Sequence, residues 1–371
     1  MSHAVAAVVE EPGAAFTLQD IELDEPRPHE VVVTMVAAGL CHTDLSVRAG
    51  GLPFPLPGVL GHEGAGIVEA VGAAVTRIAP GDSVVLTFTS CGRCERCRTG
   101  HPAHCDTWLP DNLLGGQRSD GTSTLYRGES GIGGRFFGQS SFSTRALVDE
   151  RSLVKVDPDV PLDVVAPLGC GIQTGAGTVL NVLRPANGSS LAVFGAGAVG
   201  LAAVIAGGWA GADPVIAVDL VAHRLELALE LGATHVVNAA EEDVTAALRE
   251  LTGGRGVANA VESTGNVGVL RTAVDSLAAR GTCAVVGAPP FGAEVALDVN
   301  GLLSGKRVIG VTEGDSEPET LIPFLVRQYR AGRLPLEKLV TPFDFADINK
   351  AADAVHSGEV IKPVLRFSPR P

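Results

Sequence analysis

The chain has 371 residues, which is enough for about two domains of ordinary size. An apolar fraction of 46% supplies buried cores and excludes a largely disordered chain. The formal net charge of −14, without any dense cluster of Lys and Arg, argues against a nucleic-acid-binding surface.

The N-terminal segment does not resemble a secretory signal, because Met1–His3 lacks a basic region and Glu10 and Glu11 interrupt the apolar run. Residues 189–212 carry no charge and are long enough to cross a bilayer, but six glycines interrupt them. We therefore expect a strand–turn–helix there and no membrane partner. An odd number of cysteines, seven, argues against a disulfide framework and favours the reducing cytoplasm.

Residues 1 to about 170 are predicted to be β-rich, with short apolar runs punctuated by Gly and Pro. From 172 to about 312 the pattern changes to short buried strands separated by segments of helix length. The predicted strands are 191–194, 215–218, 236–237, 257–261 and 282–286, and the predicted helices are 198–210, 222–231, 241–251 and 267–280. This alternation indicates βαβ units around a parallel sheet. A helix near 317–331 and apolar pieces ending at Val364-Leu365 complete the chain.

The first chemical motifs are Cys41-His42-Thr43-Asp44 and Gly61-His62-Glu63-Gly64, joined much later by Cys170. Two thiolates and one imidazole make a zinc site with three protein ligands and an open fourth position. The formal charge of this set with Zn²⁺ is zero. Taken singly, each of these residues is more often a packed core residue, so that alternative stays open.

Four further cysteines have the spacing C-x2-C-x2-C-x7-C, at Cys91, Cys94, Cys97 and Cys105. Four thiolates on one compact loop can close a tetrahedral zinc site with no open position, which is typical of a structural metal. Basic residues of the same loop, Arg93, Arg96 and Arg98, can offset the excess negative charge. An iron–sulfur cluster also takes four cysteines and is the rival interpretation, ahead of buried free thiols.

A glycine-rich turn, Gly195-Ala196-Gly197-Ala198-Val199-Gly200, follows a predicted strand and opens a predicted helix. Glycines in this arrangement allow a tight bend and close approach of a pyrophosphate to the helix N-terminus. Asp219 ends the next strand, where a carboxylate binds the adenosine ribose and repels a 2′-phosphate, so NAD is favoured over NADP. The alternative is that these glycines serve only helix packing.

The order of these motifs resembles the zinc-containing medium-chain dehydrogenases over essentially the whole chain. Within that superfamily, the segments 90–94, 136–142 and 169–174 look most like bacterial aryl-alcohol (benzyl-alcohol) dehydrogenases. The resemblance implies an α/β protein: a GroES-like β-rich catalytic domain and a Rossmann doubly wound parallel-sheet domain for the cofactor. The expected bounds are 1–171 and 313–371 for the catalytic domain, with a zinc lobe at about 91–105, and 172–312 for the Rossmann domain.

The resemblance also implies residue roles. Cys41, His62 and Cys170 match the catalytic zinc ligands, Glu63 a carboxylate near the metal, Asp44 the group that orients His62, and Thr43 the hydroxyl that accepts the substrate's proton. His42 and Lys362 match cationic positions at the cofactor pyrophosphate, Arg224 a basic residue beside the ribose, and Val286 is a further cofactor-binding candidate. Two zinc ions per chain, NAD and a homo-oligomer, either a dimer or a tetramer, are expected.

The expected activity is reversible oxidation of a small-molecule primary alcohol, aryl, benzylic or allylic, to its aldehyde. Four aromatic residues, Phe88, Trp108, Phe137 and Phe142, are candidates to line a slot for such a substrate, although plain packing is the commoner role of such residues. Two departures stand out: Ser46 occupies the position of the terminal histidine of the proton path in liver-type relatives, and Lys362 replaces an arginine. A thiol-adduct dehydrogenase and a silent nucleotide-binding protein are the alternatives.

Overall fold

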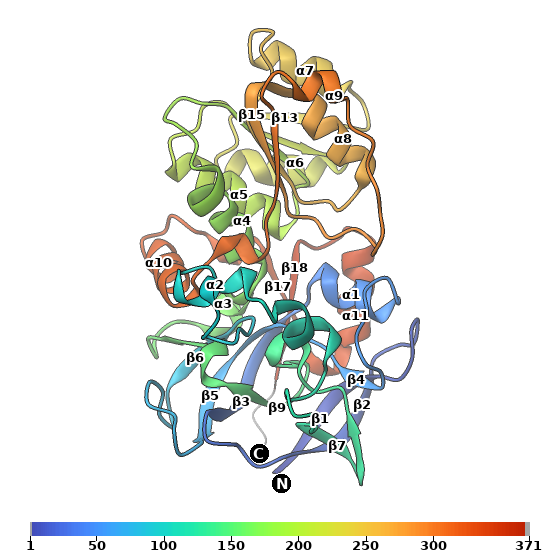
Figure 1. The fold of residues 1–371 in the computed structure, drawn as a ribbon, viewed down its shortest axis with the longest axis vertical. Helices are drawn as coiled ribbons and strands as arrows, with labels where there is room; N and C mark the ends of the chain where they lie inside the picture. Colours follow the sequence, from blue (N-terminus) through green and yellow to red (C-terminus); the bar gives the residue numbers. More distant parts are fainter. Residues whose placement is uncertain (1, 368–371) are drawn as a thin grey trace. The chain divides into compact units, whose positions relative to one another are not determined.

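The computed structural model describes residues 2–367, which form two compact units (Figure 1). The first unit runs to Cys170 and resumes at Glu317, and the second spans Gly171–Ser316. The chain returns to the first unit at Glu317, four residues later than the predicted return to the catalytic domain at 313. The segment 313–316 stays with the second unit because Gly314 packs on Gly177, where an added Cβ would lie 2.5 Å from the Gly314 carbonyl oxygen.

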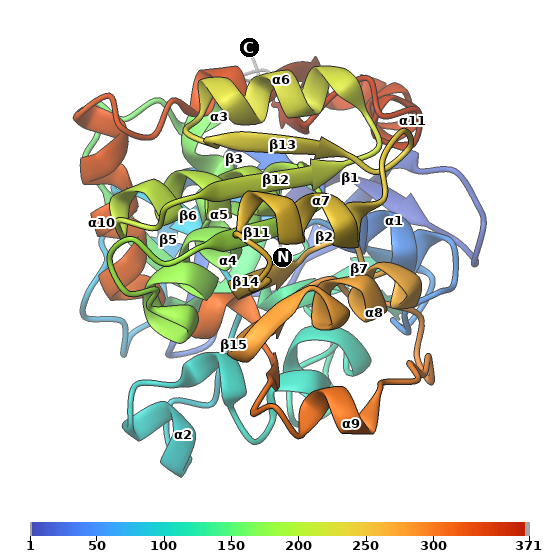
Figure 2. The ribbon, with the colours of Figure 1, turned by 90° about the horizontal axis from the view of Figure 1, so that it is seen from above.

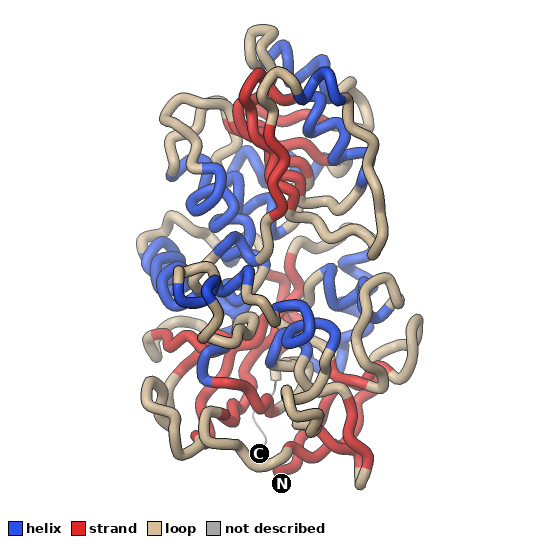
Figure 3. Tube along the Cα trace, in the orientation of Figure 1, coloured by secondary structure: helices blue, strands red, loops and turns tan. Residues whose placement is uncertain are grey.

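The first unit contains two sheets, whose strands are red in Figure 3. One has the order β4 (Gly58–Val59), β1 (Ser2–Val9), β2 (Thr17–Leu23), β7 (Leu125–Arg127), β8 (Ser130–Ile132). The other has the order β10 (Leu153–Val156), β6 (Ser83–Leu86), β5 (Glu63–Val71), β3 (Glu30–Gly39), β18 (Lys362–Arg366), β17 (Val340–Asp344), with β9 (Arg145–Asp149) also paired to β3. The predicted β-rich character of residues 1–170 is therefore confirmed.

The helices of this unit are short apart from two near the C-terminus. They are α1 (His42–Arg48), α2 (Glu95–Arg98), α3 (Leu162–Val165), α10 (Pro318–Arg330) and α11 (Ile348–His356), with single turns at Pro102–His104, Pro110–Leu114, Phe136–Gly138, Glu150–Ser152, Ala166–Gly169, Leu336–Lys338 and Phe345–Asp347. The helix α10 confirms the prediction near 317–331.

The register of β3 brings distant segments together. Gly39, the last residue of β3, pairs with Glu63 of β5 on one side and with Val364 of β18 on the other. The first residue of β18 is Lys362, so the end of β3 places three parts of the chain beside one another. The hydrophobic core under these sheets includes Val33, Leu60 and Phe136, each almost wholly excluded from solvent.

The second unit is built on a six-stranded parallel sheet. Its order is β13 (His235–Asn238), β12 (Val215–Asp219), β11 (Leu191–Phe194), β14 (Val257–Glu262), β15 (Leu277–Val285), β16 (Arg307–Gly310). Figure 2 shows β13, β12, β11, β14 and β15 side by side. The chain moves outward from β11 to β13 and then returns to β14, so the strand order reverses between β11 and β14, where doubly wound sheets bind ligands.

Helices cover both faces of this sheet. They are α4 (Gly171–Gly177), continued by a turn at Thr178–Leu183, α5 (Ala198–Trp209), α6 (Ala222–Glu230), α7 (Val244–Leu251), α8 (Val267–Asp275) and α9 (Val299–Leu302), with a further turn at Glu313–Asp315. On one face Ala192 and Phe194 of β11 pack with Leu248 of α7 and Val274 of α8. The alternate side chains of β11 are buried too, and α5 packs against β11, β12 and β14.

Most predicted elements of this unit are confirmed, but one prediction is wrong. Residues 276–280 were expected to extend a helix, whereas α8 ends at Asp275 and β15 begins at Leu277. Leu277 pairs with Val257 in the sheet, and Arg280 has a positive φ of 64°, which a helix cannot contain. The strand–turn–helix in 189–212 is confirmed as β11 and α5. Among the residues described, no helix is both long and apolar enough to cross a bilayer.

Candidate functional site

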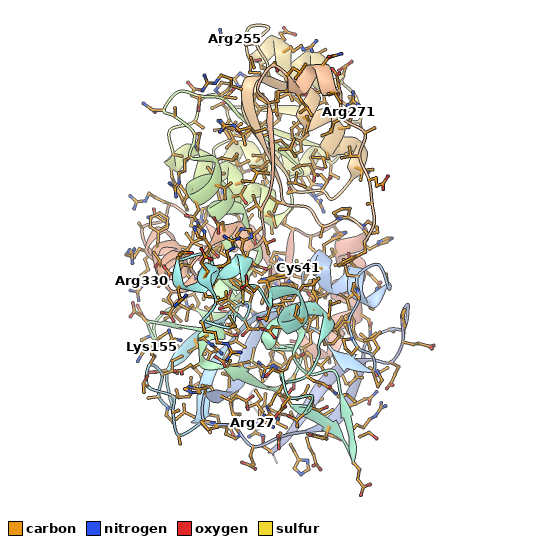
Figure 4. All side chains as sticks on the ribbon, viewed as in Figure 1. Arg27, Cys41, Lys155, Arg255, Arg271 and Arg330 are labelled. Atoms are coloured by element: carbon orange, nitrogen blue, oxygen red, sulfur yellow. The ribbon has the colours of Figure 1, made fainter. Side chains whose placement is uncertain are left out.

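Four potential metal ligands meet in the first unit. Donor atoms of Cys41, His62, Glu63 and Cys170 all lie within 4.8 Å of one another. Cys41, which Figure 4 labels, is the residue before α1, and Glu63 begins β5 directly after His62. Cys170 follows the turn at Ala166–Gly169. The structure thus brings together side chains that the sequence separates by more than a hundred residues.

Asp44 orients His62. Both side chains are fully buried, and Oδ1 of Asp44 lies 3.0 Å from Nδ1 of His62. The same carboxylate accepts the backbone N–H groups of Cys41 at 2.9 Å and Gly61 at 3.0 Å. Because Nδ1 faces a carboxylate, it carries a proton, and Nε2 faces the thiol cluster. Within residues 2–367, Nε2 of His62 is a buried atom that has no hydrogen-bond partner.

The electrostatics of the cluster favour a bound cation. Burial opposes a positive His62 ring, but the charge of Asp44 and its hydrogen bond hold the pKa of His62 well above its usual value. A hydrogen bond from Cys170, against the effect of burial, and the positive Lys362 hold the pKa of Cys41 well below that of a free thiol. A thiolate is the form that binds metals. An orphaned imidazole nitrogen beside two thiols is therefore a donor set that fits zinc.

Glu63 and Lys362 form a buried ion pair. Nζ of Lys362 lies 2.9 Å from Oε1 of Glu63 and 3.4 Å from the carbonyl oxygen of Leu40. The carboxylate fits against Gly39, where an added Cβ would lie 2.0 Å from Oε2. Burial raises the pKa of Glu63, and Lys362 opposes that shift. The structure places the Lys362 ammonium against Glu63, and its role at a cofactor pyrophosphate stays a prediction.

The helix α1 carries the predicted proton-relay residues. Oγ1 of Thr43 lies 3.9 Å from Sγ of Cys41, so the hydroxyl adjoins the ligand cluster. His42 is exposed, whereas Thr43 and Ser46 are half-buried. The structure therefore brings Thr43 to the cluster as the sequence suggests, and the assigned roles of Thr43 and His42 remain predictions.

The four candidate slot aromatics separate into two groups. Phe137 stacks on His62 with ring centroids 4.5 Å apart, and Trp108 meets Phe137 edge-on at 5.7 Å. Phe142 is fully buried and packs edge-on against Phe16 at 5.8 Å, which is the packing role that the sequence left open as the commoner one. Phe88, 3% exposed, is also part of the core. None of these four aromatics lies on a strand, so a linear pattern along the sequence does not tell which ring contacts His62.

The cysteine lobe has the geometry of a closed metal site. Sγ atoms of Cys91, Cys94, Cys97 and Cys105 lie within 4.8 Å of one another. The separations 91–97, 94–97 and 94–105 are 4.0, 3.4 and 4.0 Å. Tetrahedral zinc with Zn–S bonds of about 2.3 Å would set sulfurs ~3.8 Å apart. This agreement fits a structural zinc ion.

A fourth basic residue, beyond the three expected from the sequence, lies at the lobe. Arg93, Arg96 and Arg98 are exposed side chains. Arg151, which the sequence did not single out, donates from Nη1 to the carbonyl oxygen of Cys91 at 2.5 Å. Nearby thiol charge and Asp149 raise the pKa of Arg151, with Asp149 the larger cause. No local sequence signal links residue 151 to the lobe.

The glycine turn of the second unit has the geometry of a nucleotide-binding loop. Gly195 has φ of 94°, and a Cβ on Gly200 would lie 1.7 Å from the Gly195 carbonyl oxygen. Around Gly197, which precedes α5, a Cβ would meet no described atom within 4 Å. Two glycines are thus required by the protein itself, while the middle one leaves open space beside a helix N-terminus. That space fits a pyrophosphate.

Asp219 lies at the end of β12 and fastens this turn. Its Oδ2 accepts the N–H of Ala196 at 2.6 Å, and its Oδ1 accepts the N–H of Val221 at 2.9 Å. Arg224 lies half-buried in the first turn of α6, and Val286 directly follows β15. The contacts of these three residues with a cofactor remain predictions.

Comparisons with known proteins agree with this architecture. The family description "Alcohol dehydrogenase GroES-like domain" matches residues 27–158, and "Zinc-binding dehydrogenase" matches residues 198–327. A geraniol dehydrogenase of Castellaniella defragrans is 44% identical over 98% of both chains.

Two crystal structures cover 99% of this chain and the whole of theirs. An alcohol dehydrogenase zinc-binding domain protein from Burkholderia ambifaria is 49% identical with a TM-score of 0.96. A benzyl alcohol dehydrogenase from Acinetobacter calcoaceticus is 46% identical with a TM-score of 0.95.

The chain belongs to the zinc-containing medium-chain alcohol dehydrogenase family. It is an alcohol-oxidising enzyme whose cofactors are zinc and NAD. The expected fold class, a GroES-like β-rich domain plus a Rossmann domain, is confirmed, and so is the resemblance to aryl-alcohol dehydrogenases.

Proposed function

We propose that the physiological substrate is a primary alcohol whose hydroxyl-bearing carbon adjoins an sp² carbon, as in benzylic and allylic alcohols. Two relatives support this proposal: one named for geraniol, an allylic alcohol, and one named for benzyl alcohol. They share that feature despite different carbon skeletons. An sp² neighbour favours oxidation because the aldehyde product is conjugated.

The observation that carries the catalytic assignment is the orphaned Nε2 of His62. It is a buried ring nitrogen without a hydrogen-bond partner in the described part of the chain, and it faces the thiols of Cys41 and Cys170. Such an atom is costly to bury unless a ligand satisfies it. These three residues would hold the catalytic zinc with one position open to substrate, and the four cysteines of the lobe would hold a structural zinc.

When bound, the zinc would supply a Lewis acid that lowers the pKa of the alcohol, and NAD would supply the hydride acceptor. The chain's own residues orient the metal ligands and transfer the substrate's proton. Asp44 fixes the tautomer of His62, and the Thr43 hydroxyl takes the substrate's proton while passing its own onward. Glu63 and Lys362 form an ion pair with no net charge beside the ligands.

The cofactor would lie along the glycine turn of the second unit. Gly195, Gly197 and Gly200 would admit the pyrophosphate, with Asp219 on the ribose. Arg224 would lie beside that ribose, Val286 would contact the cofactor at the end of β15, and His42 and Lys362 would meet the pyrophosphate.

We further propose a homo-oligomer in the cytoplasm. The edge strand β16 exposes Val308 and Ile309, and Leu303 and Val299 nearby are 79% and 70% exposed. An apolar sheet edge favours pairing with a second copy. Four clustered thiols that fit a metal site favour a reducing compartment. Sedimentation of the purified protein tests the first point, and a monomer would contradict it.

One set of measurements tests the activity and the zinc sites together. We expect kcat/KM for benzyl and allylic alcohols to exceed that for ethanol and for secondary alcohols. We expect two zinc ions per chain, one lost in Cys170→Ser together with turnover, and the other lost in Cys105→Ser with a fall in stability. A preference for ethanol would contradict the substrate class. A single zinc, or iron, would contradict the metal assignment.

A further inference from the structure

The segment 136–142 lies alongside the chain that leads to His62. Oγ of Ser140 donates to the carbonyl oxygen of Val59 at 2.6 Å. The N–H groups of Phe142 and Ser141 donate to the carbonyl oxygens of Leu60 and Gly61 at 3.0 and 2.9 Å. Successive residues before His62 are therefore each held by this segment.

Gln139 continues the series across the ligands themselves. Its Nε2 donates to the carbonyl oxygen of His62 at 2.9 Å, and its Oε1 accepts the N–H of Gly64 at 3.1 Å. The two peptide groups that flank Glu63 are thus bound by one side chain, which is 1% exposed. A carboxamide suits this position because it donates and accepts without carrying charge.

The side-chain amide of Gln139 is also connected, through Thr87, to the backbone beside Cys170. Nε2 of Gln139 also donates to the carbonyl oxygen of Thr87 at 3.2 Å. Oγ1 of Thr87 donates to the carbonyl oxygen of Gly169 at 2.8 Å, one residue before Cys170. Gly169 has no room for a side chain, because a Cβ would lie 2.0 Å from the Leu86 carbonyl oxygen. Buried hydrogen bonds therefore connect the backbone at His62 with the backbone at Cys170.

The backbone around Gln139 is held in an unusual conformation. Phe137, Gly138 and Ser140 have positive φ values of 50°, 72° and 48°. Non-glycine residues adopt this region at a cost, which persists where surrounding contacts enforce it. Here the enforced conformation stacks Phe137 on the His62 ring while Gln139 binds the His62 backbone. The strained backbone of segment 136–142 therefore lies where this segment contacts His62.

We propose that Gln139 is a positioning residue that, through Thr87, holds the His62–Glu63 backbone and the Cys170 loop in the geometry that binds the catalytic zinc. The inference rests on the proposed zinc site at Cys41, His62 and Cys170. It makes the retention of that zinc depend on an amide that hydrogen-bonds to the backbone of His62, Gly64 and Thr87. We expect the structural zinc in the lobe to be unaffected, because these hydrogen bonds join Gln139 to His62, Gly64 and Thr87.

The test is the rate at which each zinc passes to a chromophoric chelator. Gln139→Met removes the amide and keeps its length, and Thr87→Val removes one hydroxyl at constant shape. Partners that support metal ligands typically alter metal affinity about 10- to 100-fold. We expect Gln139→Met to speed release of the catalytic zinc at least about tenfold, with a smaller acceleration in Thr87→Val and an unchanged lobe zinc.

A matched control is Asn349→Leu. The Asn349 amide also binds backbone on both sides, accepting from the Phe16 N–H at 3.1 Å and donating to its carbonyl oxygen at 2.9 Å. The Asn349→Leu variant should have a lower melting temperature but unchanged release rates for both zinc ions. Cys170→Ser identifies which kinetic phase belongs to the catalytic zinc.

The outcomes separate the two hypotheses. Wild-type protein that lacks a second zinc, or a Cys170→Ser variant that keeps both, contradicts the zinc site itself. Two zinc ions with an unaltered catalytic phase in folded Gln139→Met contradict the role of Gln139. If Gln139→Met does not fold, Thr87→Val decides, and release at the wild-type rate overturns the proposal.

Discussion

Lys362 and Glu63 form an ion pair of 2.9 Å that joins the first residue of β18 to the first residue of β5, with side chains 4% and 0% exposed. The pair is possible because Gly39, between them in the sheet, leaves space for the carboxylate. Nearly three hundred residues separate the partners in sequence. Each charge is buried beside the proposed metal ligands and depends on the other for compensation.

Removing one partner should therefore be costly. Lys362→Met leaves a buried carboxylate uncompensated, and breaking such pairs typically costs about 3–5 kcal/mol. We expect a loss of this size in urea unfolding. The double variant Lys362→Met with Glu63→Gln should recover part of it, because no buried charge is then left alone. If the loss of unfolding free energy in the double variant equals the sum of the losses in the two single variants, the two residues are not coupled.

Asp44→Asn should disturb His62 without changing the size of the side chain. The carboxylate accepts three hydrogen bonds, from Cys41, Gly61 and Nδ1 of His62, whereas an amide presents a donor to one of them. We expect kcat to fall roughly 10- to 100-fold with partial loss of zinc. Asp243→Asn, at the N-terminal cap of α7 in the other unit, is the control and should keep both kcat and the zinc content unchanged. Full activity with full zinc content in Asp44→Asn would contradict the orienting role.

Asp219 should decide between NAD and NADP, and the structure adds a second effect. Its carboxylate binds the N–H groups of Ala196 and Val221, so it also fastens the glycine turn. Asp219→Gly should raise the KM for both cofactors while increasing the NADP-to-NAD ratio of kcat/KM by about tenfold or more, because a 2′-phosphate is no longer repelled. Steady-state kinetics with each cofactor measure this. An unchanged ratio would mean that Asp219 does not face the ribose.

The relay role of Thr43 predicts a graded series. Thr43→Ser keeps the hydroxyl and should keep most activity, whereas Thr43→Ala should lower kcat about 10²-fold, a typical loss for a positioned proton-transfer group. Ser46→Ala, on the same short helix, should be nearly silent because its hydroxyl does not titrate near neutrality. Steady-state kcat of the three variants measures this series. Equal activity in Thr43→Ala and Thr43→Ser would contradict the relay.

Local sequence was sufficient for the chemistry that short segments encode. The C-x2-C-x2-C-x7-C spacing predicts a closed four-thiol cluster because its ligands share one loop, and the described thiols do converge. The glycine turn likewise follows from a strand, a tight bend and a helix within a dozen residues. Such patterns depend on neighbours along the chain, so they can be recognised before any tertiary contact is known.

Only the tertiary structure decided which distant residues support the site. Gln139 reaches His62 across 77 residues, and Lys362 reaches Glu63 across 299. The end of α8 at Asp275 and the burial of Phe142 against Phe16 likewise depend on strand pairing and core packing. The Lys362–Glu63 contact and the end of α8 are set by sheet register, in which a shift of one residue turns a side chain to the opposite face, and a linear pattern does not contain that register. The contacts of Gln139 and Phe142, which lie outside the strands, depend on how the loop 136–142 packs.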